Sequence, residues 1–445
     1  MRRDLRLPYL VVGTVFLLQL GRLLSFTLSH AVNLLYWDQW DFWTPLFERA
    51  SLWRTFTWQL GAPRLGVGLV VTSALAGLTR WDARAQALAM VAIVAAAALA
   101  ALWLKRALLG RLAVTDAVIP ILFLSVAQHE TLLGATDLSH GPFPLLLAVL
   151  ICLAWLHPDR RVRYGLVLVL NFLAIYTAFG FFMGLITPAL LALDAAAAAR
   201  AGRRSEAVGA AVACAVAILS LASFFVGYTF APGVEGFRFP YGRPLAYPWY
   251  AALMFANVFG LKARDGLAAS VAGVGLVLFV AAVLAAQLGR LVRAGEGEAR
   301  TSRSIVILAG FSLLFAAGAA VGRVHLGDET AASSRYYLYL LTGVLALYLH
   351  LLGVRRAAPR RWGLAVLLPA SVVAGFHTTR LDRDTINHVT NGKAAWRVCY
   401  LRTADIAGCD AATDFLVYPK SGEAVLKAKL DYLERNRLDL YADPR

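Results

Sequence analysis

The sequence predicts an all-helical protein that crosses a membrane about eleven times. Hydrophobic residues make up 59% of the 445-residue chain and charged residues only 16%, whereas soluble domains are about 25% charged. Apolar runs close to the roughly 20 residues that cross a bilayer recur along the chain, and basic clusters separate alternate runs. This composition excludes a disordered chain, a disulfide scaffold and a typical soluble enzyme.

Eleven apolar runs are the expected spans, and their middles are almost free of charge. Several are shorter than a full crossing, so their limits are approximate. Two further stretches, 65–79 and 247–261, are short and bounded by charge or Pro. They are interfacial or re-entrant helices or, as a pair, two extra crossings, which gives a range of 11–13. The eleven expected spans cover residues 7–29, 84–104, 112–128, 142–156, 164–179, 181–197, 206–228, 267–291, 304–321, 336–353 and 362–377.

The formal net charge is +16, and the placement of the basic residues indicates how the spans are oriented in the membrane. Short connections on one side of the membrane carry nearly all of it, and the positive-inside rule places them in the cytoplasm. The N-terminus is then inside and the C-terminal tail outside, with the first run kept as an uncleaved anchor. A nucleic-acid partner is not needed to explain the charge. The basic clusters lie within 2–6, 105–111, 160–163, 200–204, 290–303 and 355–361.

The first outer loop, residues 30–66, is dense in aromatic and acidic side chains. Asp38 and Asp41 are three residues apart and share a face if the segment is helical. Aromatic residues are common at a membrane interface, and Asp41 can equally cap a following helix. The apolar periodicity of 41–60 predicts a surface helix. Asp38 and Asp41 are the candidate catalytic residues of this loop.

Polar residues of the later outer connections are candidates for substrate contact. Arg335 and Tyr336 lie where the chain re-enters the membrane. Arginine suits bidentate contact with a phosphate, although a snorkelling arginine beside an aromatic belt has the same sequence. No spacing demands a metal ion, so no metal ligand is assigned. The remaining candidates for substrate binding are His129, Glu130, Arg243, His325 and Glu329.

The tail, residues 378–445, has a different composition and no spanning run. Leucines at helical spacing after Val425 predict one amphipathic helix. Cys399 and Cys409 lie on the expected oxidising side and are a candidate disulfide. So short a segment is a cap and not an independent enzyme.

This architecture resembles the GT-C superfamily, polytopic glycosyltransferases that use polyprenyl-phosphate-linked sugars. The resemblance rests on a first span with its N-terminus inside, an acidic and aromatic first outer loop, many further spans and an outer C-terminal tail. It implies that an acid of that loop, Asp38 and secondly Asp41, is the catalytic base. It also implies that a later basic residue, by position Arg335, meets the donor phosphate. The acids form a DxxD pattern here, whereas many members have adjacent or one-apart acids.

The resemblance further implies a cell-envelope enzyme of the cytoplasmic (inner) membrane of a bacterium. Its partners are a polyprenyl-phosphate-linked sugar, membrane lipid and a glycan, lipid or protein acceptor, with a divalent metal left open. Two other classes fit the same composition. A transporter of lipid or polysaccharide needs charges near the membrane midplane, and a non-catalytic scaffold needs a partner for its tail.

Overall fold

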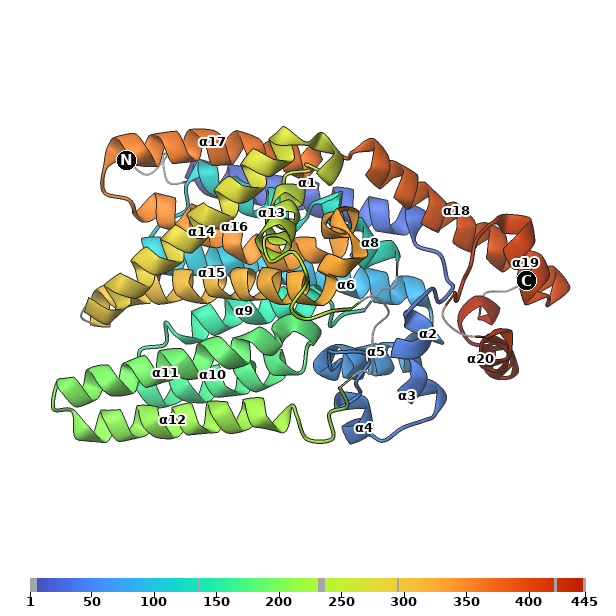
Figure 1. The fold of residues 1–445 in the computed structure, drawn as a ribbon, viewed down its shortest axis with the longest axis horizontal. Helices are drawn as coiled ribbons and strands as arrows, with labels where there is room; N and C mark the ends of the chain where they lie inside the picture. Colours follow the sequence, from blue (N-terminus) through green and yellow to red (C-terminus); the bar gives the residue numbers. More distant parts are fainter. Residues whose placement is uncertain (1–5, 135–136, 231–236, 294–295, 420–421, 443–445) are drawn as a thin grey trace.

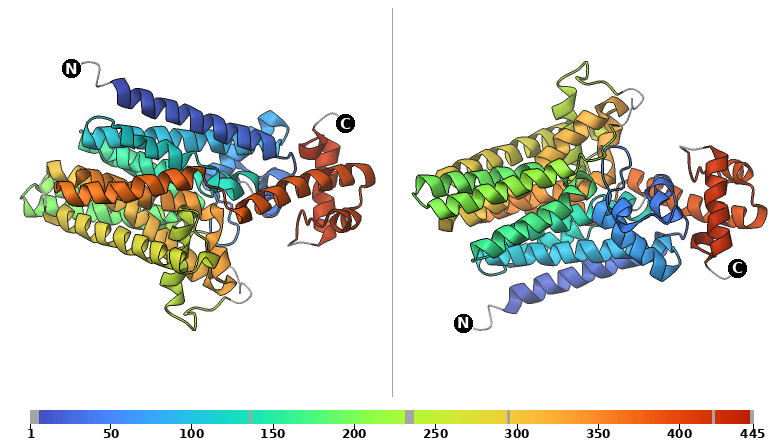
Figure 2. Two further views of the ribbon diagram at one scale, coloured as in Figure 1. Left: turned by 90° about the horizontal axis from the view of Figure 1, so that it is seen from above. Right: turned by 90° about the horizontal axis from the view of Figure 1, so that it is seen from below.

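A computed structural model describes residues 6–134, 137–230, 237–293, 296–419 and 422–442. The regular secondary structure of these ranges is helical throughout (Figure 1). The longer helices lie side by side in one bundle, and the chain enters at the opposite end from the one where its tail projects (Figure 2). The helices of the bundle are α1 (Arg6–His30), α6 (Ala83–Leu109), α7 (Val118–Phe123), α8 (His129–Leu133), α9 (Pro142–Ala154), α10 (Arg160–Ile175), α11 (Met183–Arg200), α12 (Arg204–Ser223), α13 (Ala246–Val258), α14 (Leu267–Arg293), α15 (Glu296–Arg323), α16 (Tyr337–Gly353) and α17 (Ala357–Phe376).

Nine helical stretches of the described residues are long and apolar enough to cross a membrane. The prediction of a membrane-embedded helical protein is therefore confirmed, but the count of eleven is not. Two of the expected spans, 142–156 and 164–179, form α9 and α10, which have only 13 and 16 residues. The expected span 112–128 falls within one of the nine, residues 114–133, which comprise α7, α8 and two short 3-10 turns instead of one continuous helix.

The two stretches left open by the sequence form helices too short to span a bilayer. The helix α5 (Gly66–Thr79) has 14 residues and α13 has 13. At 1.5 Å per residue each reaches about 20 Å, against a hydrocarbon thickness of about 30 Å. The helix α5 lies beside the first outer loop at one end of the bundle (Figure 1). In contrast, α13 is buried from Tyr250 to Val258 between α14, α15 and α16.

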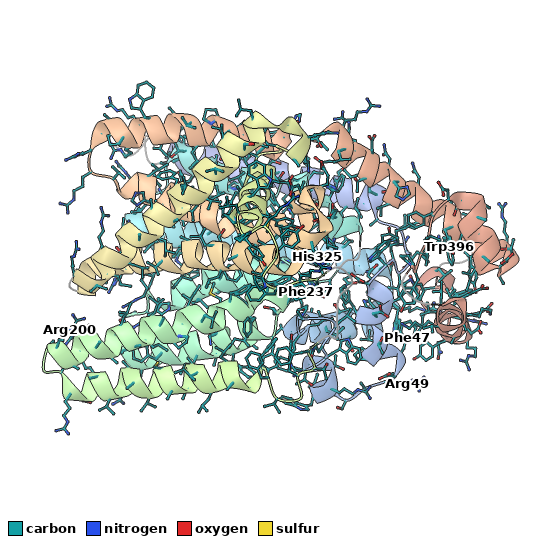
Figure 3. All side chains as sticks on the ribbon, viewed as in Figure 1. Phe47, Arg49, Arg200, Phe237, His325 and Trp396 are labelled. Atoms are coloured by element: carbon teal, nitrogen blue, oxygen red, sulfur yellow. A yellow bond between two sulfur atoms is a disulfide. The ribbon has the colours of Figure 1, made fainter. Side chains whose placement is uncertain are left out.

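The basic connections predicted on one side of the membrane share one end of the bundle. The turn between α11 and α12, the adjoining ends of α14 and α15, and the start of α17 lie at the left in Figure 1. Arg200 marks this end in Figure 3, and Trp396 of the tail marks the other. Arg2 and Arg3 lie outside the described residues. The bundle thus has a basic end and a tail end.

The first outer loop and the tail share a hydrophobic core separate from the main core. Instead of the one surface helix expected over 41–60, the loop forms α2 (Gln39–Phe42), α3 (Thr44–Phe47) and α4 (Leu52–Phe56). The tail is therefore half of a cap built with the loop, not a separate unit. Its helices project beyond the bundle in both views of Figure 2 and are α18 (Arg380–Thr403), α19 (Ile406–Thr413) and α20 (Glu423–Asn436).

Aromatic rings join the two halves of this cap. The ring of Tyr36 stacks on Phe415 at 5.1 Å, and Phe47 meets the edge of Tyr432 at 5.5 Å. The amphipathic helix predicted in the tail is α20, which buries Leu426, Leu430 and Leu433. Cys399 and Cys409 form the expected disulfide, which joins α18 to α19. Burial of large aromatic surfaces stabilises the cap.

Candidate functional site

A cavity of about 430 Å³ lies at the tail end of the bundle, where the first outer loop, α8, the 3-10 turns η6 (Asp328–Ala332) and η7 (Ser334–Tyr336), and the start of α18 meet. We call it the Arg335 cavity. Three cationic and three carboxylate side chains line it, together with aromatic and aliphatic groups. Its lining residues are Tyr36, Trp37, Glu130, Gly134, Lys262, Arg323, Leu326, Glu329, Thr330, Ala332, Ser333, Arg335, Tyr336, Leu381, Asp382, Thr385 and Val389.

Arg335 and Glu130 form the central pair of this cavity. The Nε of Arg335 lies 3.4 Å from Oε2 of Glu130 and donates to Oγ of Ser333 at 3.2 Å. The Ser333 hydroxyl in turn donates to the same Oε2. No described residue bonds to the two Nη atoms of Arg335 or to Oε1 of Glu130, and both side chains are partly exposed. The pair therefore offers a forked donor and a carboxylate oxygen to a ligand.

The main chain fixes the relative position of this pair. Glu130 is in the first turn of α8, and its backbone N–H donates to Oγ of Ser334 at 2.9 Å. Ser334 is buried, so this bond ties the start of α8 to η7. Ser333 thus holds the side chain of Glu130, and Ser334 holds its main chain. This arrangement restricts the rotamers of Glu130 before any ligand arrives.

Lys262 and Asp382 form a buried ion pair on another wall. The Lys262 ammonium lies 2.9 Å from Oδ1 of Asp382 and donates to Oδ1 of Asn257 at 2.7 Å. The side chains are only 4% and 14% exposed. The other Asp382 oxygen accepts from Thr379 in a capping box at the start of α18. Because both charges are already satisfied, this pair shapes the wall of the cavity.

Arg323 and Glu329 have looser surroundings. The Arg323 guanidinium lies 5.7 Å from the ring centroid of Tyr336, a cation–π distance. Neither Arg323 nor Glu329 forms an ion pair with another described residue, and Glu329 is exposed. Tyr336 is buried and lines the cavity next to Arg335. Arg323 therefore adds to the cavity a cationic group that has no ion-pair partner among the described residues.

The first outer loop reaches the cavity through Tyr36 and Trp37. Burial raises the pKa of Tyr36, while the nearby charge of Arg335 acts in the opposite direction. Trp37 has a φ of 55°, in the left-handed region that a bulky residue rarely adopts. Its backbone N–H donates to the carbonyl of Val417 in the tail at 2.9 Å. The tail thus helps to hold a strained turn whose indole lines the cavity.

Asp38 and Asp41, the predicted catalytic acids, do not line the Arg335 cavity. Asp38 is half-buried at the start of α2, directly after Trp37. Asp41 lies within α2, accepts a hydrogen bond from Tyr418 and lies 3.6 Å from the Lys429 ammonium. The partners of Asp41 belong to the tail, so its contacts join the two halves of the cap.

Three other sequence candidates lie outside the lining of the cavity. His129 is buried beside Glu130, and its Nδ1 has no partner in the described part of the chain. His325 packs against the edge of Phe237 at 5.8 Å, and the two lie together in Figure 3. Arg243 is exposed. Of the sequence candidates, the structure brings together Glu130, Glu329, Arg335 and Tyr336.

The sequence did not single out Lys262, Asp382 or Arg323 as site residues. A capping-box signature, Thr379 followed by Asp382, was readable in the sequence, but nothing local indicates that its carboxylate pairs with Lys262. Within the ranges that the structure describes, no group of three or more His, Cys, Asp and Glu residues is arranged to hold a metal ion.

No protein-family model matches this sequence, and no curated protein or solved structure matches it either.

Proposed function

We propose that this protein is a membrane glycosyltransferase of the GT-C type, which moves a sugar from a polyprenyl-phosphate donor to an acceptor hydroxyl. The observation that carries the proposal is the pair in the Arg335 cavity. Arg335 presents two unbonded Nη atoms and Glu130 an unbonded Oε1, between aromatic walls at the end of a membrane-spanning bundle. Such a place suits a substrate whose lipid chain stays in the bilayer.

The chemistry follows from these two groups. The acceptor oxygen attacks the anomeric carbon, its proton passes to Oε1 of Glu130, and the bond from that carbon to the phosphate oxygen breaks. The polyprenyl phosphate leaves with a negative charge, which Arg335 stabilises by a forked contact and Arg323 supports from the side. Glu130 replaces Asp38 as our candidate base, because Glu130 lines the cavity and Asp38 does not.

Two features support an outer location for this site. The basic connections lie at the opposite end of the bundle, which the positive-inside rule assigns to the cytoplasm. The disulfide of the tail lies at the cavity end, and disulfides persist on the oxidising side of a membrane. We therefore assign the cavity to the outer face of the cytoplasmic membrane.

The placement of the ion pairs at the two ends of the bundle favours a transferase over a carrier. Lys105 pairs with Asp116 and Arg303 with Asp194 toward the basic end. The pairs Lys262–Asp382 and Arg335–Glu130 lie at the tail end. A carrier is expected to hold its polar groups near the midplane, where its substrate passes.

The test uses membranes that contain the full chain and a panel of polyprenyl-phosphate-linked sugars. Release of polyprenyl phosphate is measured with and without added acceptor lipids and glycans. We expect release from at least one donor, with a loss of about 100-fold or more in Arg335→Gln. Arg264→Gln is the matched control, since Arg264 is an exposed arginine near the same end that does not line the cavity. Equal rates in the two variants, or no release from any donor, would overturn the proposal.

A further inference from the structure

A second cavity opens on the outside of the bundle, between α1 and the junction of α17 and α18. Its volume is about 450 Å³, and it is separate from the Arg335 cavity, with which it shares no lining residue. We call it the α1–α17 groove. Three of its lining residues are cationic or can become so, and none is a carboxylate. Its polar lining comprises Arg22, Ser25, Ser29, His30, Arg383 and Asn387, together with Thr378.

Arg22 lies beside the end of α17, eight residues before the end of α1. Its Nη1 donates to the carbonyl of Gly375 at 2.7 Å and its Nη2 to that of Phe376 at 3.3 Å. These are the last residues of α17, and the following helix, α18, is rich in charged residues. Carbonyl oxygens orient the guanidinium and carry no formal charge to neutralise it. Arg22 forms no ion pair with a described residue.

Arg383 and His30 complete the polar rim of the groove. Arg383 is exposed, and its Nη1 donates to the carbonyl of Thr378 at 2.6 Å. It also lacks a carboxylate partner within the described part of the chain. The Nδ1 of His30 bonds to the carbonyl of Phe26 at 2.8 Å. Because a carbonyl oxygen can only accept, Nδ1 carries the hydrogen and Nε2 remains for another group.

The apolar surface beside this rim is exposed. Leu18 on α1, one turn before Arg22, is 67% exposed, and Val373 and Phe376 on α17 are 60% and 54% exposed. In a membrane these side chains meet acyl chains, while the polar rim lies at the head-group level. A structural role explains the bonds of Arg22 to α17. It does not explain why Arg383, His30 and two serines line the same opening with no acidic counterpart.

We propose that the α1–α17 groove binds the phosphate of an anionic membrane lipid. Arg22 and Arg383 contact the phosphate oxygens, Ser25 donates a further hydrogen bond, and the lipid chains lie along the exposed apolar surfaces of α1 and α17. Charge complementarity decides the occupant, since the groove gathers positive charge and adjoins hydrocarbon. This site is distinct from the proposed donor site and does not depend on the transferase activity.

The test measures lipid retention, not turnover. The full-length protein is extracted from bilayers of phosphatidylcholine with a minor fraction of phosphatidylglycerol, and the bound lipids are counted by native mass spectrometry. We expect wild type to retain phosphatidylglycerol over phosphatidylcholine, and Arg383→Gln to weaken that retention about tenfold. Arg380→Gln is the matched control: Arg380 is three residues earlier on α18, lies outside the groove and is 86% exposed.

Three outcomes would overturn the proposal. The first is equal retention in Arg383→Gln and Arg380→Gln, and the second is no preference for the anionic lipid in wild type. The third comes from a competition arm with inorganic phosphate at the concentration of the lipid phosphate. If inorganic phosphate displaces phosphatidylglycerol fully, the groove is a site for free phosphate. Arg22→Gln serves as a second variant, expected to lose the same lipid, with its folding checked by thermal unfolding.

Discussion

The ammonium of Lys262 lies 2.9 Å from the carboxylate of Asp382 in a pair almost closed to solvent. The pair ties the connection after α13 to the first turn of α18. Asp382→Asn leaves the Lys262 charge buried and uncompensated, so we expect a loss of about 3 kcal/mol in the free energy of unfolding. Thermal and denaturant unfolding of the detergent-solubilised protein measures it.

Asp384→Asn is the control for that substitution. Asp384 lies on the same helix, but its side chain is 65% exposed. Its ion pair with Arg380 is long, at 3.9 Å. Its loss should change stability by less than about 1 kcal/mol, as is typical of exposed pairs. Similar stabilities for the two variants would show that the Lys262–Asp382 pair does not hold α18 in place.

Substitutions of Glu130 and Asp38 should have opposite effects on the proposed transfer reaction. Glu130→Gln keeps the shape of the side chain but removes the base, so sugar transfer should fall by about 100-fold or more. Asp38→Asn should keep most of the activity, because Asp38 does not line the cavity. Single-turnover rates on an active donor compare the two. Loss of transfer in Asp38→Asn with activity kept in Glu130→Gln would restore the base implied by the sequence.

Asp439 should make the stability of the cap depend on pH. Complete burial raises the pKa of Asp439 from 3.8 to about 7. Between these values the folded chain keeps a proton that the unfolded chain has released. The contribution of Asp439 to the free energy of unfolding therefore falls as the pH rises from about 4 to about 7. Above pH 7 it stays at its lower value. The thermal unfolding midpoint across this range measures the effect.

Asp439→Asn should flatten that pH dependence. Asparagine keeps an oxygen for the backbone N–H of Leu35, which bonds to Asp439 at 3.2 Å, and it tolerates the φ of 48° at this position. Asparagine does not titrate, so the free energy of unfolding of the variant relative to wild type should increase from about pH 4 to about pH 7. An unchanged pH slope in the variant would assign the dependence to another group.

The disulfide should contribute measurably to the cap. Cys399 and Cys409 are 10 residues apart, and closing a loop of that length is worth about 3 kcal/mol in the chain-entropy model. Replacing both with Ser should lower the unfolding free energy by that order and speed proteolysis of α19. Cys214→Ser, which changes a free cysteine, is the control. No difference between the two variants would mean that packing alone holds α19.

The apolar composition and the basic clusters in alternate connections were sufficient to predict the helical membrane bundle. Both patterns arise because the bilayer accepts apolar helices and because basic loops stay on the cytoplasmic side. The span count was less predictable. The short helices α9 and α10 satisfy the hydropathy pattern but not the length of a crossing, and α13 is a short helix buried by its neighbours. Hydropathy does not separate burial in protein from burial in lipid.

The site was predictable only in part, because it depends on long-range contacts. The sequence identified Arg335 and Glu130 separately, but their pairing requires α8 to pack against η7. The sequence also proposed Asp38 and Asp41 of the first outer loop, but it is their neighbours Tyr36 and Trp37 that line this cavity. Arg64 is a further example: it is buried and donates to the carbonyls of Phe224 and Val226, a role without any local signature.

The shared core of the first outer loop and the tail has a consequence for biosynthesis. The loop is synthesised before most of the spans and the tail after all of them. The loop therefore cannot pack against the tail until the whole bundle has been inserted. Until then the loop lacks its tail partners, among them Phe415 against Tyr36 and Tyr432 against Phe47. A chain that stops before α18 also lacks Asp382 and the wall that it forms. The Arg335 cavity is therefore completed last, which ties any activity there to finished translocation.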